Sequence, residues 1–222
     1  MPSILVFLFV MWIIISAFMQ AEDNPKKSYI SPGLTAFCGV LVLTSTIMGE
    51  TPVRSGITLA AALILLALSD FMFERSSQND GLFPVAMVFG VLSGFTIGIL
   101  FNLTAFNKGI PLWWWTFTAL FAVLLTIYMF RFLKVESALK VPVYIYLVQA
   151  VVLLTGGLSS LYTQNYAFAI WGIFIYISDT LVGIRAFPSI ERPIRWLNAR
   201  RILFLIIVIY YSAQYALVSW AL

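Results

Sequence analysis

The sequence has little charge and no histidine, and both absences narrow what the protein can be. Lysine, arginine, aspartate and glutamate together make up only 10% of the 222 residues, whereas hydrophobic residues make up 62%. Soluble domains contain about 25% charged and about 45–50% apolar residues. A chain of this composition cannot cover a water-facing surface, so we expect an integral membrane protein.

The missing residue types also exclude several kinds of site. Without histidine, the chain can form neither a His-based catalytic triad nor a His-ligated metal centre. Its single cysteine, Cys38, lies in the middle of an apolar run, which excludes a disulfide framework and a cysteine zinc site. We therefore expect no metal and no other cofactor.

Long apolar runs predict an all-α integral membrane protein with eight transmembrane helices in a single domain, residues 1–222. Each run has about the 20 residues that a helix needs to cross a bilayer. The runs are continuous and do not alternate with period two, which favours helices over barrel strands. The predicted spans are 3–19, 30–48, 56–74, 84–103, 111–133, 141–162, 165–187 and 201–221.

The basic residues predict the orientation of these helices. Eleven of the thirteen lysines and arginines fall at the first, third, fifth and seventh connections between spans. The positive-inside rule places those connections in the cytoplasm, so both termini are predicted to be non-cytoplasmic. The basic groups would then face anionic lipid, with no nucleic acid as a partner. We expect a multi-pass protein, in the inner or plasma membrane if the source is bacterial.

A weak internal similarity accompanies this arrangement. A shift of 109 residues lays Ser69-Asp70 on Ser178-Asp179 and the first three spans on the fifth to seventh. Identity is otherwise slight, so the sequence allows either a four-plus-four parallel duplication or a chance match.

Two aspartates inside apolar runs are the strongest candidates for a functional site. Asp70 and Asp179 lie about 7 Å and about 12 Å from the predicted cytoplasmic ends of their spans, at ~1.5 Å per residue. A central aspartate costs roughly 2.5–3.5 kcal/mol on insertion scales, so each needs a reason. They either face one cavity as a catalytic pair or are held structurally, by Arg75, Arg185 or nearby hydroxyls. Glu74 lies one turn after Asp70, as a site residue or an interfacial acid.

Polar residues in the seventh and eighth spans form a second candidate group. Gln214 follows Tyr210 by four residues and Tyr211 by three, so its amide can share a helix face with either phenol. Tyr176 precedes Asp179 by three residues, on a stripe that includes Gly172. These residues either bind substrate or make interhelical hydrogen bonds, and the glycine either admits substrate or allows close helix packing.

Three segments resemble the YhhN-like membrane family, whose animal members are lysoplasmalogenases. The segments are LSDFMFE (68–74), ISDTLVGIRAF (177–187) and IYYSAQYAL (209–217). The resemblance implies eight spans, an acid in the third and seventh, a Tyr-x-x-Gln pattern in the last, and a basic residue before the second. Lys26 or Lys27 would occupy the basic position. Many bacterial members also have a fourth-span histidine, whereas here Thr96 lies near that position.

The resemblance implies hydrolysis of the vinyl ether of a lysophospholipid to a fatty aldehyde and a glycerophospho-alcohol. Asp70 and Asp179 would be the catalytic acid and base, in the manner of paired carboxylates in glycoside hydrolases. Lys26, Lys27 and Arg185 could hold the phosphate. Two other classes stay open at this stage: a proton-coupled transporter of lipids or small molecules, and a lipid-binding membrane protein without activity.

Overall fold

The computed structural model describes residues 2–21, 29–76, 79, 81–131, 140–186 and 199–222, which form eight α-helices and no strand. Each predicted span coincides with one helix to within a few residues, so the all-helical prediction is confirmed. The helices are α1 (Pro2–Ala21), α2 (Ile30–Ile47), α3 (Val53–Arg75), α4 (Leu82–Asn107), α5 (Leu112–Phe130), α6 (Lys140–Tyr162), α7 (Tyr166–Ala186) and α8 (Ala199–Ala221).

The helices have the length and hydropathy of membrane spans. In the described part of the chain, seven are long and apolar enough to cross a bilayer, and α1 contains a shorter apolar stretch, Val6–Met19. Large apolar side chains point outward all around the bundle, including Phe7, Ile57 and Leu120, which are 62%, 52% and 58% exposed. This surface suits a multi-pass membrane protein, because lipid rather than water would cover it. Which membrane it occupies, and which end faces the cytoplasm, stay predictions.

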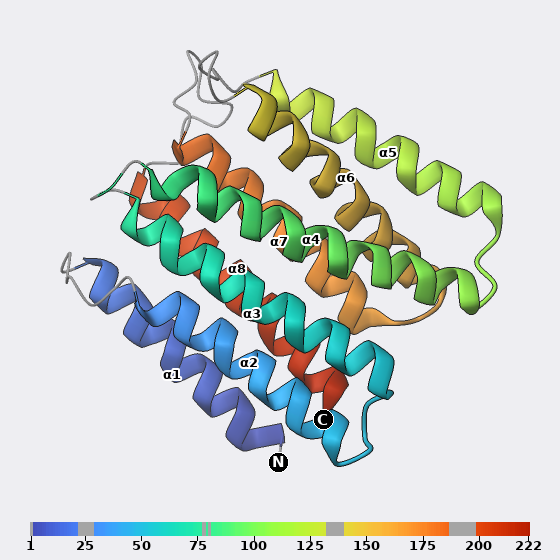
Figure 1. Cartoon of the computed structure of the whole chain (residues 1–222), viewed down its shortest axis with the longest axis horizontal. Coiled ribbons are helices and arrows are strands. Elements are labelled where there is room, and N and C mark those ends of the chain that lie inside the picture. The colour runs from blue at the N-terminus through green and yellow to red at the C-terminus, as the bar shows by residue number, and fades with distance from the viewer. Residues whose placement is uncertain (1, 22–28, 77–78, 80, 132–139, 187–198) are drawn as a thin grey trace.

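The helices run side by side and alternate in direction, so both termini lie at one end of the bundle (Figure 1). Helix α3 packs between α2 and α4, while α6 packs against α4, α5 and α7. Helix α8 contacts α7, α1 and α2, and thereby closes the bundle behind α3. The starts of α2, α6 and α8 and the ends of α3 and α7 consequently meet at the end opposite the termini.

The predicted duplication would relate α2 to α6 and α4 to α8. The non-consecutive pair α4–α6 is in contact, and so is the corresponding pair α8–α2. These contacts fit a parallel arrangement of two four-helix halves, but the duplication itself stays a prediction.

Small residues let α6 approach its neighbours closely. A Cβ atom on Gly172 of α7 would lie 2.8 Å from the Cα of Gly157 on α6. A Cβ atom on Gly98 of α4 would lie 3.0 Å from the backbone of Leu153 on α6. Gly172 therefore serves close helix packing, the structural one of its two sequence interpretations. These contacts fix α7 against α6 and α6 against α4.

Candidate active site

Polar side chains from several helices gather at the end of the bundle opposite the termini. They include Asp70 near the end of α3, Asp179 in the last third of α7, and Tyr210 in the first half of α8. Helices α2 and α6 add hydroxyl groups near their first turns. Alternating helix direction brings these positions together, although they are far apart in the sequence.

Asp70 is the acceptor of a hydrogen-bond network. Its Oδ2 accepts from the Tyr210 hydroxyl at 2.6 Å, the Thr35 hydroxyl at 3.2 Å and the Ser31 hydroxyl at 3.3 Å. The short distance to Tyr210 is typical of an O–H donor to a charged acceptor. Three helices, α2, α3 and α8, are therefore joined at a single carboxylate oxygen.

Thr35 holds this network together. Its side chain is fully buried, and its hydroxyl oxygen lies 2.8 Å from the Tyr210 hydroxyl and 3.1 Å from the Ser31 carbonyl. A threonine hydroxyl has one hydrogen, so it donates to one of its three neighbours at a time and can accept from Tyr210. The hydroxyl hydrogens of Thr35 and Tyr210 can therefore be redistributed among these acceptors without movement of a helix.

Asp179 faces the same region from α7. Its carboxyl group interacts electrostatically with the Tyr146 phenol of α6. Asp70 interacts electrostatically with both Asp179 and Tyr146, so the two carboxyl groups lie within electrostatic range of each other. Both aspartates are half-buried, which leaves each carboxyl group partly accessible within the bundle. Hydroxyl groups hold Asp70, which is one of the structural interpretations that the sequence allowed. The electrostatic interaction of Asp70 with a second acid, Asp179, is a separate observation.

Tyr211 connects α8 to α1 beside the acid site. Its hydroxyl hydrogen-bonds the Ser16 hydroxyl of α1, and both side chains are buried. It also interacts electrostatically with Asp70 and Glu74. Glu74 is half-buried on α3 within the electrostatic reach of Asp70.

Two predicted site residues have their partners elsewhere. The Tyr176 hydroxyl lies 3.1 Å from the Thr126 hydroxyl of α5, and the ring packs in a cluster with residues of α5 and α6. The Gln214 oxygen accepts a long hydrogen bond, 3.5 Å, from the Trp171 indole of α7. Their hydrogen bonds are therefore with α5 and α7 rather than with the acids, and their role in substrate binding stays a prediction.

The predicted phosphate-binding residues can be located only in part. Lys26 and Lys27 lie outside the described residues. Arg185 lies in the last turn of α7, at the same end of the bundle as the acids, and its side chain is also outside the described part. Their roles stay predictions.

Sequence reasoning missed three hydroxyl groups of the site, Ser31, Thr35 and Tyr146. The signal for the first two was available, because a four-residue spacing places both hydroxyls on one face of α2. Tyr146 could not be separated from Tyr144, two residues away, without the helix packing. Tyr144 is 51% exposed on α6, whereas Tyr146 turns inward to Asp179.

Thr96, which lies near the fourth-span histidine position of many family members, does not donate a hydrogen bond to the acid site. The Thr96 hydroxyl donates to the Leu92 carbonyl of its own helix at 2.7 Å. In the described part of the chain, no three histidine, cysteine or acidic side chains gather as they would around a metal ion. The prediction that the protein uses no metal stays untested.

The chain was compared with known protein families, curated proteins and solved structures. The family model for the YhhN family matches residues 28–220. This match covers α2 to α8 nearly completely and includes every residue of the acid site except Ser16. None of the curated proteins and none of the solved structures matches the chain.

Proposed function

Since this chain belongs to the YhhN family, we propose that it hydrolyses the vinyl-ether bond of single-chain ether phospholipids within the membrane. The observation that carries the proposal is the pair of interacting carboxyl groups, Asp70 on α3 and Asp179 on α7. Hydroxyl groups of α2 and α8 hold Asp70 in place before substrate arrives, and the Tyr146 phenol of α6 interacts with Asp179.

The reaction begins with protonation of the outer vinyl carbon. We assign this step to Asp179, which interacts with the Tyr146 phenol and lacks the three hydroxyl donors that stabilise the charged form of Asp70. The proton adds to the carbon through the electrons of the double bond, and the carbon attached to oxygen becomes an oxocarbenium ion. General acids contribute about 10²- to 10⁴-fold to a reaction rate when they are positioned in this way.

The second step adds water to the oxocarbenium ion. We assign the base to Asp70, because hydroxyl groups that donate to a carboxylate stabilise its charged form. The negative carboxylate stabilises the cation and takes a proton from the attacking water. The resulting hemiacetal then breaks its bond to the glycerol oxygen, which receives a proton. The products are a fatty aldehyde and a glycerophospho-alcohol, so one water is consumed and no oxidant or reductant is needed.

The position of the acids in the bundle suits an amphiphilic substrate. Both lie several residues inside the helix ends, where a vinyl ether would sit if the phosphate stayed at the interface and the chain entered the bilayer. Direct turnover tests the proposal: purified protein should release aldehyde from a vinyl-ether lysophospholipid. It should leave the saturated alkyl-ether analogue intact, because that analogue has no double bond to protonate. Uptake of lipid into vesicles without chemical change would contradict a hydrolase.

The hydrogen bond from Tyr210 to Asp70 gives a first prediction on mutation. Tyr210→Phe removes the 2.6 Å hydrogen bond, which is worth about 1.5–3 kcal/mol for a charged acceptor. We expect kcat/KM to fall by about 10- to 100-fold with the fold retained. Tyr215→Phe on the same helix is the matched control, since the Tyr215 ring packs edge-on against Phe9. Equal activity in the two variants would show that the network does not serve the reaction.

A further inference from the structure

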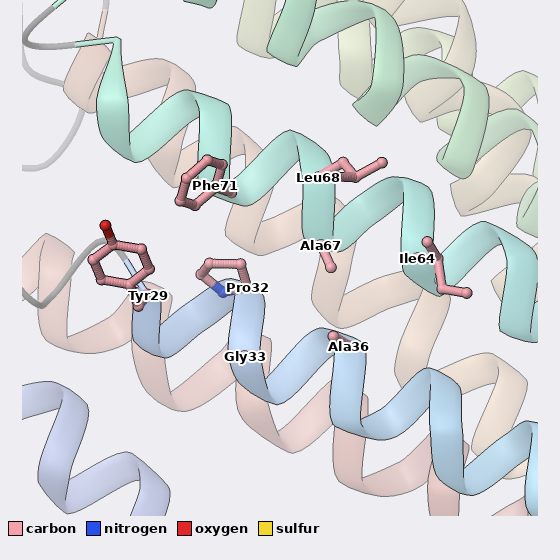
Figure 2. Close-up of a pocket in the computed structure, with 8 residues that line it drawn as sticks. All are labelled: Tyr29, Pro32, Gly33, Ala36, Ile64, Ala67, Leu68 and Phe71. Carbon is pink, nitrogen blue, oxygen red and sulfur yellow. The ribbon is translucent and has the colours of Figure 1, made fainter.

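An apolar groove lies along the seam between α2 and α3, on the outer side of the acid site. Its volume is about 340 Å³, near the lower end of small-ligand pockets at about 300–1,000 Å³. Figure 2 shows small residues facing each other across the seam and larger side chains at its ends. The groove is lined by Tyr29, Pro32, Gly33, Ala36, Ile64, Ala67, Leu68 and Phe71.

The groove opens outward and is narrow. Ile64 and Leu68 are 48% and 40% exposed along its α3 side, while Ala67 is almost fully buried beneath them. On α2, the small side chain of Ala36 leaves space in the seam. A groove of this size and lining has room for part of one hydrocarbon chain, which would enter from the bilayer.

A cationic side chain lies at one end of the groove, the end on the side of the bundle opposite the termini. The Arg75 guanidinium lies 5.3 Å from the ring centroids of both Tyr29 and Phe71, two lining residues. It also donates a hydrogen bond to the Tyr29 hydroxyl. A guanidinium has five N–H groups, so this contact uses only part of its capacity to bind a phosphate.

We propose that the α2–α3 groove binds the substrate's hydrocarbon chain and that Arg75 binds its phosphate. The proposal rests on the proposed function for the identity of the lipid, and it names a single-chain phospholipid as the occupant. Charge complementarity selects an anionic head group at Arg75, and the volume of the groove suits part of one chain rather than two chains.

The spacing along α3 matches such a lipid. Arg75 and Asp70 are five residues apart, which corresponds to about 7.5 Å along a helix axis. Six single bonds separate the phosphorus from the vinyl carbon next to oxygen, and they span roughly 7 Å when extended, at the reach per bond of a peptide chain. A phosphate on the Arg75 guanidinium, which folds back onto the Phe71 ring, would therefore leave the vinyl ether within reach of the turn that carries Asp70, and the rest of the chain would follow Ala67 and Ile64 inward.

Asp70 also lies on the seam that the groove follows. Its hydrogen bonds to Ser31 and Thr35 cross from α3 to α2, directly beside the lining residues Pro32 and Phe71. A chain in the groove would thus pass the catalytic site on its outer side. Entry would occur from the bilayer, with no passage through the water-facing end.

Binding can be tested separately from turnover with a saturated alkyl-ether lysophospholipid that has a photoreactive group in its chain. We expect cross-links to wild-type protein within residues 30–36 and 64–71, and competition by the unlabelled single-chain lipid but not by diacyl phosphatidylcholine. Cross-links spread evenly over the lipid-facing helices, or lost equally to diacyl lipid, would mean ordinary bilayer contact and would overturn the groove assignment. Cross-links in the groove without any vinyl-ether turnover would contradict only the proposed function.

Kinetics of groove variants supply the second test. Ala36→Phe fills the groove, so KM should rise by about 10-fold or more with a smaller change in kcat. Val40→Phe, one turn further along α2 and 57% exposed outside the groove, is the matched control and should behave as wild type. Equal KM values for the two variants would overturn the groove as the chain site.

The head-group end has its own pair of variants. Arg75→Gln should raise KM by about 10- to 100-fold, because a charge-assisted phosphate contact is lost, and Arg75→Lys should restore part of the loss. Arg54→Gln, at the opposite end of the same helix and exposed, should leave KM unchanged. An unchanged KM in Arg75→Gln would overturn the phosphate assignment even if turnover by wild type is established.

Discussion

Asp70→Asn and Asp179→Asn should each lower the rate of aldehyde release by about 1,000-fold or more while the helical content stays that of wild type. An amide can neither donate a proton to carbon nor accept one from water, and general acid–base groups contribute about 10²- to 10⁴-fold each. Asparagine keeps the size of the side chain and can still accept the Tyr210 hydrogen bond, so the fold has no reason to fail. Single-turnover measurements on purified protein, with circular dichroism on the same samples, check both parts.

Glu50→Gln is the matched control for these two variants. Glu50 is an exposed carboxylate in the connection between α2 and α3, at the end of the bundle away from the acids. Its conversion to an amide should leave the rate unchanged. Because the acid and base act as a unit, the double aspartate variant should be about as slow as either single variant. Wild-type rates in both single variants would show that the reaction does not use these acids.

Gly172→Leu should have the largest effect on stability. The Cβ atom alone would lie 2.8 Å from the Cα of Gly157, so α6 and α7 must move apart to admit the side chain. Overpacking of this kind costs about 3 kcal/mol or more where backbone rather than a flexible side chain is in the way. We expect a fall of about 10 °C in the thermal unfolding midpoint in detergent, at roughly 2–4 °C per kcal/mol for a chain of this size.

Ala61→Leu provides the control for that substitution. Ala61 is exposed on the outer face of α3, so a leucine there faces lipid or detergent and should leave the midpoint within about 1–2 °C of wild type. Similar midpoints for Gly172→Leu and wild type would mean that the α6–α7 contact tolerates separation. The Gly172 variant should also lose activity, because Tyr146 on α6 and Asp179 on α7 depend on that contact for their interaction.

The eight helices could be predicted from sequence because membrane spans give a strong local signal. A run of about 20 apolar residues is long enough to identify a span by itself, and proline and glycine mark its ends. The predicted span 84–103 shows the limit of this signal. Helix α4 continues for four more residues, to Asn107, because the chain stays helical until Gly109 and Pro111 although Thr104 and Asn107 interrupt the apolar run.

The two acids of the site could also be predicted, because an unpaired aspartate inside an apolar run is rare. Their common location followed from the alternating direction of the helices. The hydrogen-bond partners of the two acids could not be predicted, because the sequence does not say which face of a helix meets which neighbouring helix. Tyr176 and Gln214 were therefore placed in the site by spacing alone, whereas the structure pairs them with Thr126 and Trp171.

Hydroxyl residues are the hardest part of such a site to find. Serine and threonine are common in membrane helices and usually bond to a carbonyl of their own helix, as Thr104 does with Leu100. The spacing of Ser31 and Thr35 places two hydroxyls on one face of α2, but only the packing of α2 against α3 and α8 brings Thr35 to a carboxylate. The groove beside it depends on the same packing, and small residues such as Gly33 and Ala36 are not a binding signal by themselves.

The most direct test of the central claim is an isotope measurement on the purified wild-type protein. A vinyl-ether lysophospholipid is incubated in D₂O and, separately, in H₂¹⁸O, and the products are analysed by mass spectrometry. Protonation at carbon followed by addition of water at the vinyl carbon predicts a fatty aldehyde with one deuterium on the carbon next to the carbonyl. It also predicts a glycerophospho-alcohol without ¹⁸O. Intact lipid after incubation, or ¹⁸O in the glycerophospho-alcohol, would contradict the proposed reaction.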